Sequence, residues 1–484
     1  MGTFNGNANG GRFVAAHKEK RKHTGAWKQI LVSLALLADL FLLYTVIMQL
    51  THVQKVMELS PTVNYVALGV LGLGALALIW AVIRTQAWKR LVCLVLIFSM
   101  LYLICVFSDL PFIKKYRDIW ISTAMSTMRH QGLATFYIPA SVVDARMEIE
   151  RKGAESQEGV NSTETHENPA GTWQVEVPTD FTGEIDPNLP SNLSPEQARF
   201  YTVFHELDIE SAEAYFLEHP SVLANGYDHL LINESELGGT GTSIRTKQGE
   251  KVLTIDAPNQ ILMAEVDCDG SRGVLAVAKQ PSRLHLFSAE NVPYYGETAG
   301  SIAKRNGGVL AMTGSSFDDP GGAGNGGKVA GWAMCDGKTD GAHFAWGYKR
   351  LELHEDDWFY ITDCYSAVGS GTTDAMEFSP ALVVNGKKMD PEYWTSQNPR
   401  ACIGQSERGE ILMLCVEGRT LSSPGCSVSI CSDVLLEHDC ITALNCDGGT
   451  TAILWYRGNP IIRCSNSAIP QGRYLPNAWV YVGD

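Results

Sequence analysis

Three long apolar runs in the first quarter of the chain restrict its fold more than any other feature. They cover residues 30–50, 65–83 and 91–107, and only short polar segments separate them. Each run approaches the ~20 residues that a helix needs to cross the hydrocarbon core of a bilayer. One such run would also suit a buried helix of a soluble protein, but three in succession predict a membrane anchor of three transmembrane helices.

The first of these runs contains a single acidic residue, Asp39. A carboxylate is costly in a membrane span, so we expect Asp39 to face the other two helices. No small-residue cleavage site closes this run, and further apolar runs follow it. The pattern therefore does not indicate a cleavable signal peptide.

The distribution of basic residues predicts the orientation of the anchor. Lys and Arg are numerous before the first run and between the second and third runs, whereas the loop between the first two runs has only Lys55. Basic segments stay in the cytoplasm, which places the N-terminus inside. Three spans then put everything after residue 107 outside the cytoplasm. Lys114, Lys115 and Arg117, just past the third run, slightly oppose this orientation.

The composition narrows the class of protein. Hydrophobic residues make up 45% of the chain and charged residues 19%, which are values typical of a folded protein. The net charge of −15 argues against a nucleic-acid partner, because neutralising phosphates requires clustered Lys and Arg.

The sequence divides into four parts. Residues 1–29 form a basic cytoplasmic tail, 30–110 the anchor, 111–225 a membrane-proximal segment with a spacer and a helix, and 226–484 a globular domain. Within the third part, residues 152–194 are rich in Glu, Thr, Asn, Pro and Gly, a composition that predicts a flexible spacer. Residues 194–217 have helical apolar spacing and begin with Ser194 as a potential N-cap, with Glu196 shortly after it.

The globular domain is expected to be of the α+β class and dominated by β-sheet. Short β-rich runs such as KVLTI and EILMLCVEG alternate with turns that contain Gly, Asp and Asn. Helical stretches interrupt them near residues 298–305 and 431–438. The cysteines beyond the anchor form no CxxC pair and no zinc spacing. Cys426 and Cys431 are close enough for a short-loop disulfide, and buried thiols are an equal alternative.

Standard nucleotide and hydrolase motifs are absent. Residues 321–327 (GGAGNGG) are Gly-rich, but no strand-turn-helix pattern surrounds them, so we interpret them as a mobile surface loop. Neither GxSxG nor HExxH occurs. No cofactor is expected, and no ligand spacing requires a metal, although a divalent cation beside the carboxylates is left open.

Four Gly-containing segments of the domain follow one another in a recognisable order. They cover residues 307–317 (GGVLAMTGSSF), 378–387 (FSPALVVNGK), 399–419 (from PRACIGQ to ILMLCVEGR) and 443–482 (from ALNCDGGTTAILWYRGN to GRYLPNAWVYV). In this order they resemble the phosphodiester glycosidase family, and the likeness extends over residues 250–484.

The resemblance implies an enzyme that releases a sugar from a sugar-1-phosphodiester, with a glycan or sugar phosphate as its partner. Bacterial members are associated with exopolysaccharides, which suits a membrane-anchored domain outside the cytoplasm. Such a reaction needs a carboxylate near the anomeric carbon and positive charge or N–H groups around the phosphate. The expected catalytic residue is Asp447, and the expected substrate-binding residues are Arg400, Thr313, Gly314, Gly448, Gly449, Thr450, Arg473 and Asn477.

Two of these assignments have simpler alternatives. Arg400 is the expected bidentate phosphate ligand, but a solvated surface charge would also explain it. The amides of Gly448 and Gly449 are expected to turn toward an anion, but Asp447 followed by two glycines is equally typical of a hairpin turn.

The chain also departs from the family's pattern. Thr313 stands where the family has Asn, and Ser315 and Ser316 replace a Gly and an aromatic residue. Thr450 and Thr451 stand where the family continues with Gly and Ser. These differences favour an alternative function, a catalytically inactive glycan-binding or exopolysaccharide-assembly protein on the same scaffold.

The predicted orientation can be tested on intact cells. We expect added protease to degrade the part of the chain after residue 107 and to spare the basic N-terminal tail, because the positive charges hold that tail in the cytoplasm. Immunoblotting with antibodies to each end measures both. Protection of the C-terminal part, with digestion only after the membrane is opened, would contradict the orientation.

Overall fold

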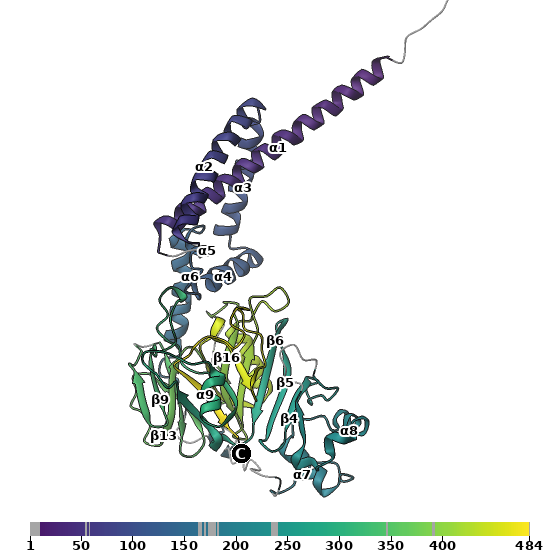
Figure 1. The fold of residues 1–484 in the computed structure, drawn as a ribbon, viewed down its shortest axis with the longest axis vertical. Coiled ribbons are helices and arrows are strands. Elements are labelled where there is room, and N and C mark those ends of the chain that lie inside the picture. The colour runs from purple at the N-terminus through teal and green to yellow at the C-terminus, as the bar shows by residue number, and fades with distance from the viewer. Residues whose placement is uncertain are drawn as a thin grey trace, which may run out of the picture. The chain divides into compact units, whose positions relative to one another are not determined.

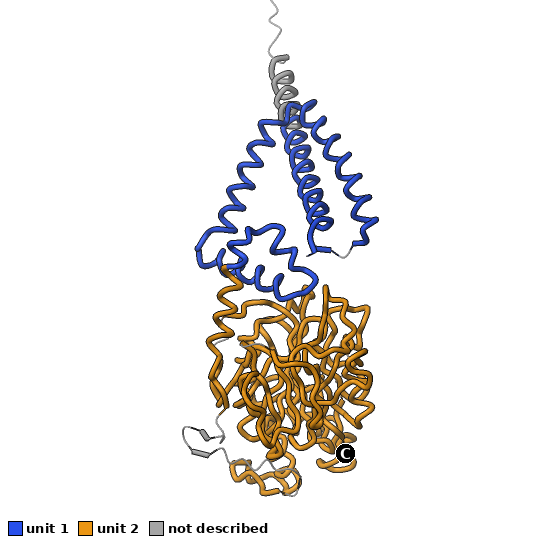
Figure 2. The backbone as a smooth tube through the Cα atoms, turned by 90° about the vertical axis from the view of Figure 1, so that its left-hand side faces the viewer, with its two compact units in different colours: residues 1–144 blue, residues 145–484 orange. Residues whose placement is uncertain are grey.

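The computed structural model describes residues 10–53, 56–57, 59–162, 167–168, 171–172, 181, 183–233, 241–344, 347–389 and 393–483. The chain divides into two compact units, Met1–Asp144 and Ala145–Asp484 (Figure 2).

Three long helices dominate the first unit. They are α1 (Gly10–Thr51), α2 (Pro61–Arg84) and α3 (Trp88–Phe107). Stretches of 27, 24 and 20 residues within them are long and apolar enough to cross a membrane. Large apolar side chains such as Leu73, Ile83 and Leu96 point outward, with exposed fractions of 65–71%. An apolar outer surface suits contact with lipid, so the structure agrees with the predicted three-helix anchor.

Asp39 of α1 faces α2, as expected from its cost in a membrane span. A Cβ atom at Gly74 would lie 2.8 Å from Asp39 Oδ1, so a glycine at this position makes room for the carboxylate. Two shorter helices, α4 (Pro111–Met125) and α5 (Gly132–Thr135), follow the third long helix, and α6 (Ala140–Ser156) leads into the second unit.

Three large antiparallel sheets form most of the described part of the second unit (Figure 1). A separate two-stranded pair consists of β1 (Glu167–Asn168) and β2 (Gly171–Thr172). The largest has the order β15 (Lys387–Lys388), β14 (Ala381–Val384), β18 (Cys440–Asn445), β16 (Arg400–Ser406), β17 (Ile411–Val416), β6 (Ser271–Ala278), β5 (Ile261–Cys268), β4 (Lys251–Asp256) and β3 (Leu231–Asn233). The second has the order β20 (Asn459–Pro460), β19 (Leu454–Tyr456), β8 (Gly308–Thr313), β21 (Asn477–Val482) and β7 (Leu284–Ser288). The third has the order β10 (Lys338–Gly341), β9 (Trp332–Cys335), β13 (Thr372–Phe378), β11 (Lys349–His354) and β12 (Phe359–Asp363).

The nine-stranded sheet is buried on both faces. Along β6, Val274 and Ala276 point into a core shared with the two smaller sheets. Leu275 and Val277, the alternate residues, point into a second core that helices cover. This double burial explains why the central strands read as nearly continuous apolar runs rather than as an alternating pattern. The predicted β-rich α+β domain is confirmed.

Helices α7 (Pro195–Val203), α8 (Ile209–Glu218) and α10 (Val428–Glu437) supply the second core. The sequence predicts one helix over residues 194–217, whereas the structure has two. Asp208 is the N-cap of α8 and accepts a hydrogen bond from Ser211 N at 2.9 Å, which restarts the helix. Ser194 caps α7 as expected, with Gln197 rather than Glu196 completing the capping box. The compact unit therefore begins before the predicted boundary at residue 226.

The first residues of the predicted spacer pack against the sheets. Gln157 is buried and exchanges two hydrogen bonds of 3.0 Å with the backbone of Ala381. Ser162 pairs with the backbone of Ile361 through two bonds of 2.8 Å. Most of residues 163–182 lie outside the described part of the chain, where the spacer remains a prediction. The helix predicted at residues 298–305 is α9 (Ala299–Arg305).

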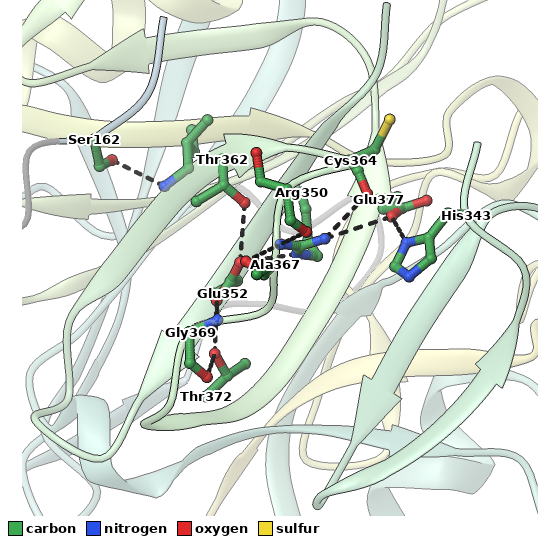
Figure 3. Close-up of polar contacts among 12 residues, drawn as sticks. Ser162, His343, Arg350, Glu352, Thr362, Cys364, Ala367, Gly369, Thr372 and Glu377 are labelled. Carbon is green, nitrogen blue, oxygen red and sulfur yellow. Dashed lines mark hydrogen bonds and ion pairs between the residues drawn. The ribbon is translucent and has the colours of Figure 1, made fainter. Parts of the chain in front are cut away.

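A buried charge network holds the third sheet together (Figure 3). Arg350 is fully buried, and its Nε donates to Glu352 Oε1 at 2.8 Å. Its other donors reach the backbone oxygens of Cys364, Ser366 and Ala367 at 3.0–3.1 Å. Burial would raise the pKa of Glu352, but hydrogen bonds from His354 and Thr372 and the charge of Arg350 hold that pKa well below its ordinary value. Since every charge has partners, we assign this network to stability.

We expect Arg350→Met to lower the free energy of unfolding by about 3–5 kcal/mol at pH 7, because the change leaves Glu352 buried without its cation. Urea denaturation of the full chain, followed by near-UV circular dichroism, measures the loss. The matched control is Arg245→Met, since Arg245 is exposed, and it should change stability by less than about 0.5 kcal/mol. Because the folded pKa of Glu352 is depressed, its contribution is present above about pH 4.3 and is lost as the pH falls further. Equal stability of the two variants would contradict the assignment.

Candidate functional site

The register of the nine-stranded sheet brings three chain segments to one edge. β16 pairs Arg400 with Val416 of β17 and Cys402 with Asn445 of β18. Residues that follow β18 therefore come level with the start of β16, and those that follow β17 lie beside them. Asp447 is the second residue past β18. The strand pairing thus explains why a carboxylate and several basic residues meet here.

Asp447 is also attached to the neighbouring sheet. Its backbone N–H donates to the oxygen of Gly314, just past β8, at 3.4 Å. Thr313 is buried, donates from its hydroxyl to Thr451 O at 2.6 Å and accepts from Ile453 N at 3.2 Å. These bonds hold the segment after Asp447 against β8. Thr313 therefore has a structural function here, and its hydroxyl is occupied.

Asn477 fixes the segment that follows Thr313. Its Oδ1 accepts from Ser315 N at 2.7 Å, and its Nδ2 donates to Ser315 Oγ at 3.1 Å. A Cβ atom at Gly314 would lie 2.3 Å from Asn477 Oδ1, so only glycine fits between them. Hydrogen bonds therefore link Asp447 to Gly314 and hold Asn477 against Ser315, so that these segments lie side by side.

The two glycines after Asp447 are required, but for a reason other than the predicted one. Gly449 has φ +66°, and a Cβ atom there would lie 2.9 Å from the guanidinium of Arg419. The amide of Gly448 donates to Asp447 Oδ1 at 3.0 Å, and that of Gly449 donates to Pro399 O at 2.9 Å. Both N–H groups thus have partners within the protein, whereas the sequence had suggested that they face an anion.

Two arginines interact electrostatically with the Asp447 carboxylate. Arg419 is exposed, donates to Thr450 Oγ1 and to Asn398 Oδ1 at 3.1 Å each, and interacts electrostatically with Asp447. Arg473 also acts on the charge of Asp447 and is held by a bidentate pair with Asp319 at 2.7 and 2.8 Å. The site therefore combines the Asp447 carboxylate with two guanidinium groups, of which that of Arg473 is ion-paired with Asp319 and that of Arg419 is exposed, an arrangement suited to an anionic substrate.

The Asp447 carboxyl has an unusual proton affinity. It is partly buried, and loss of hydration raises its pKa to about 7, against the lowering effects of Thr451, Arg473 and the Gly448 amide. A carboxyl that titrates near neutral pH can exchange protons during a reaction, and shifts of this size are frequent at catalytic positions.

The backbone of Arg400 lies at the site, but its side chain is buried within the domain. Arg400 is 9% exposed, and its guanidinium donates to Cys426 O at 3.0 Å, Ser396 O at 2.6 Å and Ser396 Oγ at 2.9 Å. These bonds fix the loops on either side of β16. The predicted phosphate contact of Arg400 remains a prediction, and Arg419 is the better exposed cation.

Sequence reasoning did not single out Arg419 or Asp319. The only sequence signal for Arg419 was its position at the end of the third family-like segment. Its interactions with Thr450 and Asp447 depend on strand register, which the sequence does not show. Asp319 gave no signal, because its partner Arg473 lies 154 positions away.

Cys426 and Cys431 are free thiols with their sulfurs 3.5 Å apart. Both are buried, which agrees with the thiol alternative.

One group among the described residues has the donor spacing for a metal ion, namely His205, Glu206 and Glu410. The buried ammonium of Lys279 already pairs with both carboxylates, at 2.8 Å from Glu410 Oε1. A cation of the protein thus lies between these carboxylates, while the buried Glu206 Oε2 has no hydrogen-bond partner within the described part of the chain.

Comparisons with known proteins relate part of this chain to one family. Residues 302–482 match the sequence model of the phosphodiester glycosidase family, and the match includes Arg419, Asp447 and Arg473. The SPbeta prophage-derived uncharacterized protein YomE of Bacillus subtilis (strain 168) is 28% identical over 166 residues, which are 32% of this chain and 25% of that protein. The chain thus spans about a quarter of the length of this curated relative.

Solved structures are similar to this chain at low sequence identity. The zebrafish N-acetylglucosamine-1-phosphodiester alpha-N-acetylglucosaminidase catalytic domain, auto-inhibited by its pro-peptide, has a TM-score of 0.39 and 15% identity over 46% of this chain and 82% of that chain. A hypothetical protein from Synechocystis has a TM-score of 0.33 and 14% identity over 49% and 65% of the two chains. On the family match, residues 302–482 carry a phosphodiester glycosidase domain, which confirms the family suggested by the four segments.

Proposed function

We propose that the protein hydrolyses glycosyl-1-phosphodiester bonds in a cell-envelope polysaccharide, outside the cytoplasm. The observation that carries the proposal is Asp447, a partly buried carboxyl just past β18 that is bonded through its N–H to Gly314 O, has a pKa raised to about 7 and interacts electrostatically with Arg419 and Arg473. The family match over residues 302–482 supports the same reaction.

The chemistry explains why one carboxylate and two cations would suffice. Hydrolysis breaks the bond between the anomeric carbon and the phosphate oxygen, water adds to that carbon, and a phosphate monoester leaves with the bonding electrons. This leaving group is stable as an anion, so it needs little help from a general acid. A carboxylate that activates water or stabilises positive charge at the anomeric carbon is still needed.

Each site residue then has a distinct function in the proposal. Asp447 in its ionised form acts on water or on the anomeric carbon. Arg419 binds the phosphate through donors that its exposed guanidinium still offers, and Arg473 holds positive charge beside Asp447 while Asp319 fixes its orientation. Arg400, Thr313 and Asn477 position the loops, and Gly314, Gly448 and Gly449 permit their close packing.

The envelope location rests on the three candidate spans and on the basic residues around them. An odd number of spans with a cytoplasmic N-terminus would put the glycosidase domain on the side where envelope glycans lie. A domain tethered in this way would act on substrates near the membrane surface.

The alternative is a glycan-binding protein without turnover. It is favoured by the engaged hydroxyl of Thr313 and the engaged amides of Gly448 and Gly449, since these groups offer no free donor to a transition state. The two proposals share the substrate class and differ only in whether the bond breaks.

The test is hydrolysis of 4-nitrophenyl sugar-1-phosphodiesters by the full chain in detergent, across glucose, mannose, galactose and N-acetylglucosamine. Cleavage at the anomeric carbon releases 4-nitrophenyl phosphate, which turns yellow only after added phosphatase removes the phosphate. We expect Asp447→Asn to lower kcat by about 10²–10⁴-fold and Arg419→Ala to raise KM by about tenfold. The exposed Arg245, changed to Ala, is the matched control and should leave both values unchanged.

The pH dependence belongs to the same experiment. Because the ionised form of Asp447 is the active one, kcat/KM should rise with pH and level off above a midpoint near 7. Full activity of Asp447→Asn would defeat the assignment. Tight binding of the substrates without turnover would favour the glycan-binding alternative.

A further inference from the structure

The Gly-rich segment 321–327 packs between two segments that carry tyrosines. A Cβ atom at Gly326, which has φ +72°, would lie 2.0 Å from Tyr474 O. A Cβ atom at Gly327 would lie 2.5 Å from Tyr295 N. Two consecutive glycines therefore bring the backbones of residues 294–295 and 474 into contact with one short loop. The sequence predicted a mobile surface loop here, whereas its glycines allow close packing.

Hydrogen bonds fasten the three segments to one another. Asn325 donates from its side chain to Tyr294 O at 2.7 Å, and its own backbone oxygen accepts from Gly296 N at 3.1 Å. Glu297 and Leu475 exchange two backbone bonds of 3.0 and 2.7 Å. The tyrosine-bearing segments are therefore cross-linked by backbone bonds and are held in a defined arrangement.

We call the three bonded segments, residues 294–297, 321–327 and 474–475, the tyrosine frame. The backbones of this frame are closely packed, but its tyrosine side chains are exposed. The exposed fractions are 74% for Tyr294, 64% for Tyr295 and 59% for Tyr474. Three large aromatic rings held in water on a fixed backbone are typical of a binding surface, because such groups are otherwise buried. A tyrosine combines a flat apolar face with a polar hydroxyl, which matches the C–H face and the hydroxyl groups of a sugar ring.

Arg473 links these tyrosine-bearing segments to the Asp447 site. Arg473, which precedes Tyr474, donates to Gly324 O at 2.9 Å as well as to Asp319, and it acts on the charge of Asp447. Asp319 in turn accepts from Gly324 N at 2.6 Å. The Gly-rich loop of the tyrosine frame is thus the loop that orients one of the two site arginines.

We propose that Tyr294, Tyr295 and Tyr474 form a stacking platform for sugar units adjacent to the scissile bond. The preferred substrate is then an oligosaccharide or polysaccharide phosphodiester rather than a compact sugar phosphodiester. The proposal rests on the proposed function for the identity of the scissile bond, but binding of the saccharide to the platform can be measured without turnover.

The test compares polymer binding with turnover of compact substrates, using the full chain in detergent. The polymer probes are phosphomannan, which contains mannose-1-phosphodiesters, and a wall polysaccharide built with N-acetylglucosamine-1-phosphate. Retardation in native gels that contain each polymer gives its dissociation constant. The compact probes are the 4-nitrophenyl phosphodiesters of the same two sugars.

We expect Tyr474→Ala, and the double variant Tyr294→Ala with Tyr295→Ala, each to weaken polymer binding by about three- to tenfold. Tyr474→Phe keeps the ring and should stay within about twofold of the unmodified protein. Tyr365→Ala is the matched control, since Tyr365 is 57% exposed on another part of the same unit. Turnover of the compact substrates should be the same in all variants.

The outcomes separate this proposal from the proposed function. Weakened polymer binding supports the platform, even if no compact substrate is hydrolysed and the hydrolase proposal fails. The platform is overturned if the variants bind the polymers as tightly as the unmodified protein does, or if the unmodified protein does not bind them. Either result would point to another partner, such as a protein. Hydrolysis of the compact substrates would still leave the hydrolase proposal standing. Loss of compact-substrate turnover in the alanine variants would also overturn the platform, because the tyrosines would then belong to the reaction centre.

Discussion

The antiparallel pairing of β16, β17 and β18 is the constraint on which the rest of the domain depends. Because this sheet is buried on both faces, a shift by one residue would exchange its two cores, and the register is therefore strongly specified. The same register sets which strand ends are neighbours. It brings Asp447, the backbone of Arg400 and the loop with Arg419 to one edge.

The charges at that edge follow from their surroundings. Burial disfavours the ionised form of Asp447, and the Thr451 hydrogen bond, the charge of Arg473 and the Gly448 amide only partly compensate, so its pKa comes to about 7. The Arg350 network shows the opposite balance, since Glu352 has enough donors to depress its pKa despite burial. Carboxylates of one domain thus serve two purposes, one structural and one suited to proton exchange near neutral pH.

The elements of the domain could be predicted from the sequence, but its side-chain partners could not. Runs such as KVLTI and EILMLCVEG became strands because β-branched and apolar residues fit a sheet buried on both faces. Asp447 could be proposed as a site residue from the glycines after it and from the family resemblance. Arg400 was preferred over Arg419 because sequence spacing cannot tell which guanidinium turns inward. That choice depends on Ser396 and Cys426, which the fold places around Arg400.

Isotope labelling tests the central claim most directly, because it identifies the bond that breaks. The full chain would hydrolyse a sugar-1-phosphodiester in water enriched in ¹⁸O, and mass spectrometry would measure the label in both products. Cleavage at the anomeric carbon, as proposed for the Asp447 site, predicts one ¹⁸O atom in the released sugar and none in the phosphate monoester, provided the sugar is analysed before its anomeric oxygen exchanges with solvent. Label in the phosphate product would mean attack at phosphorus and would contradict a glycosidase mechanism.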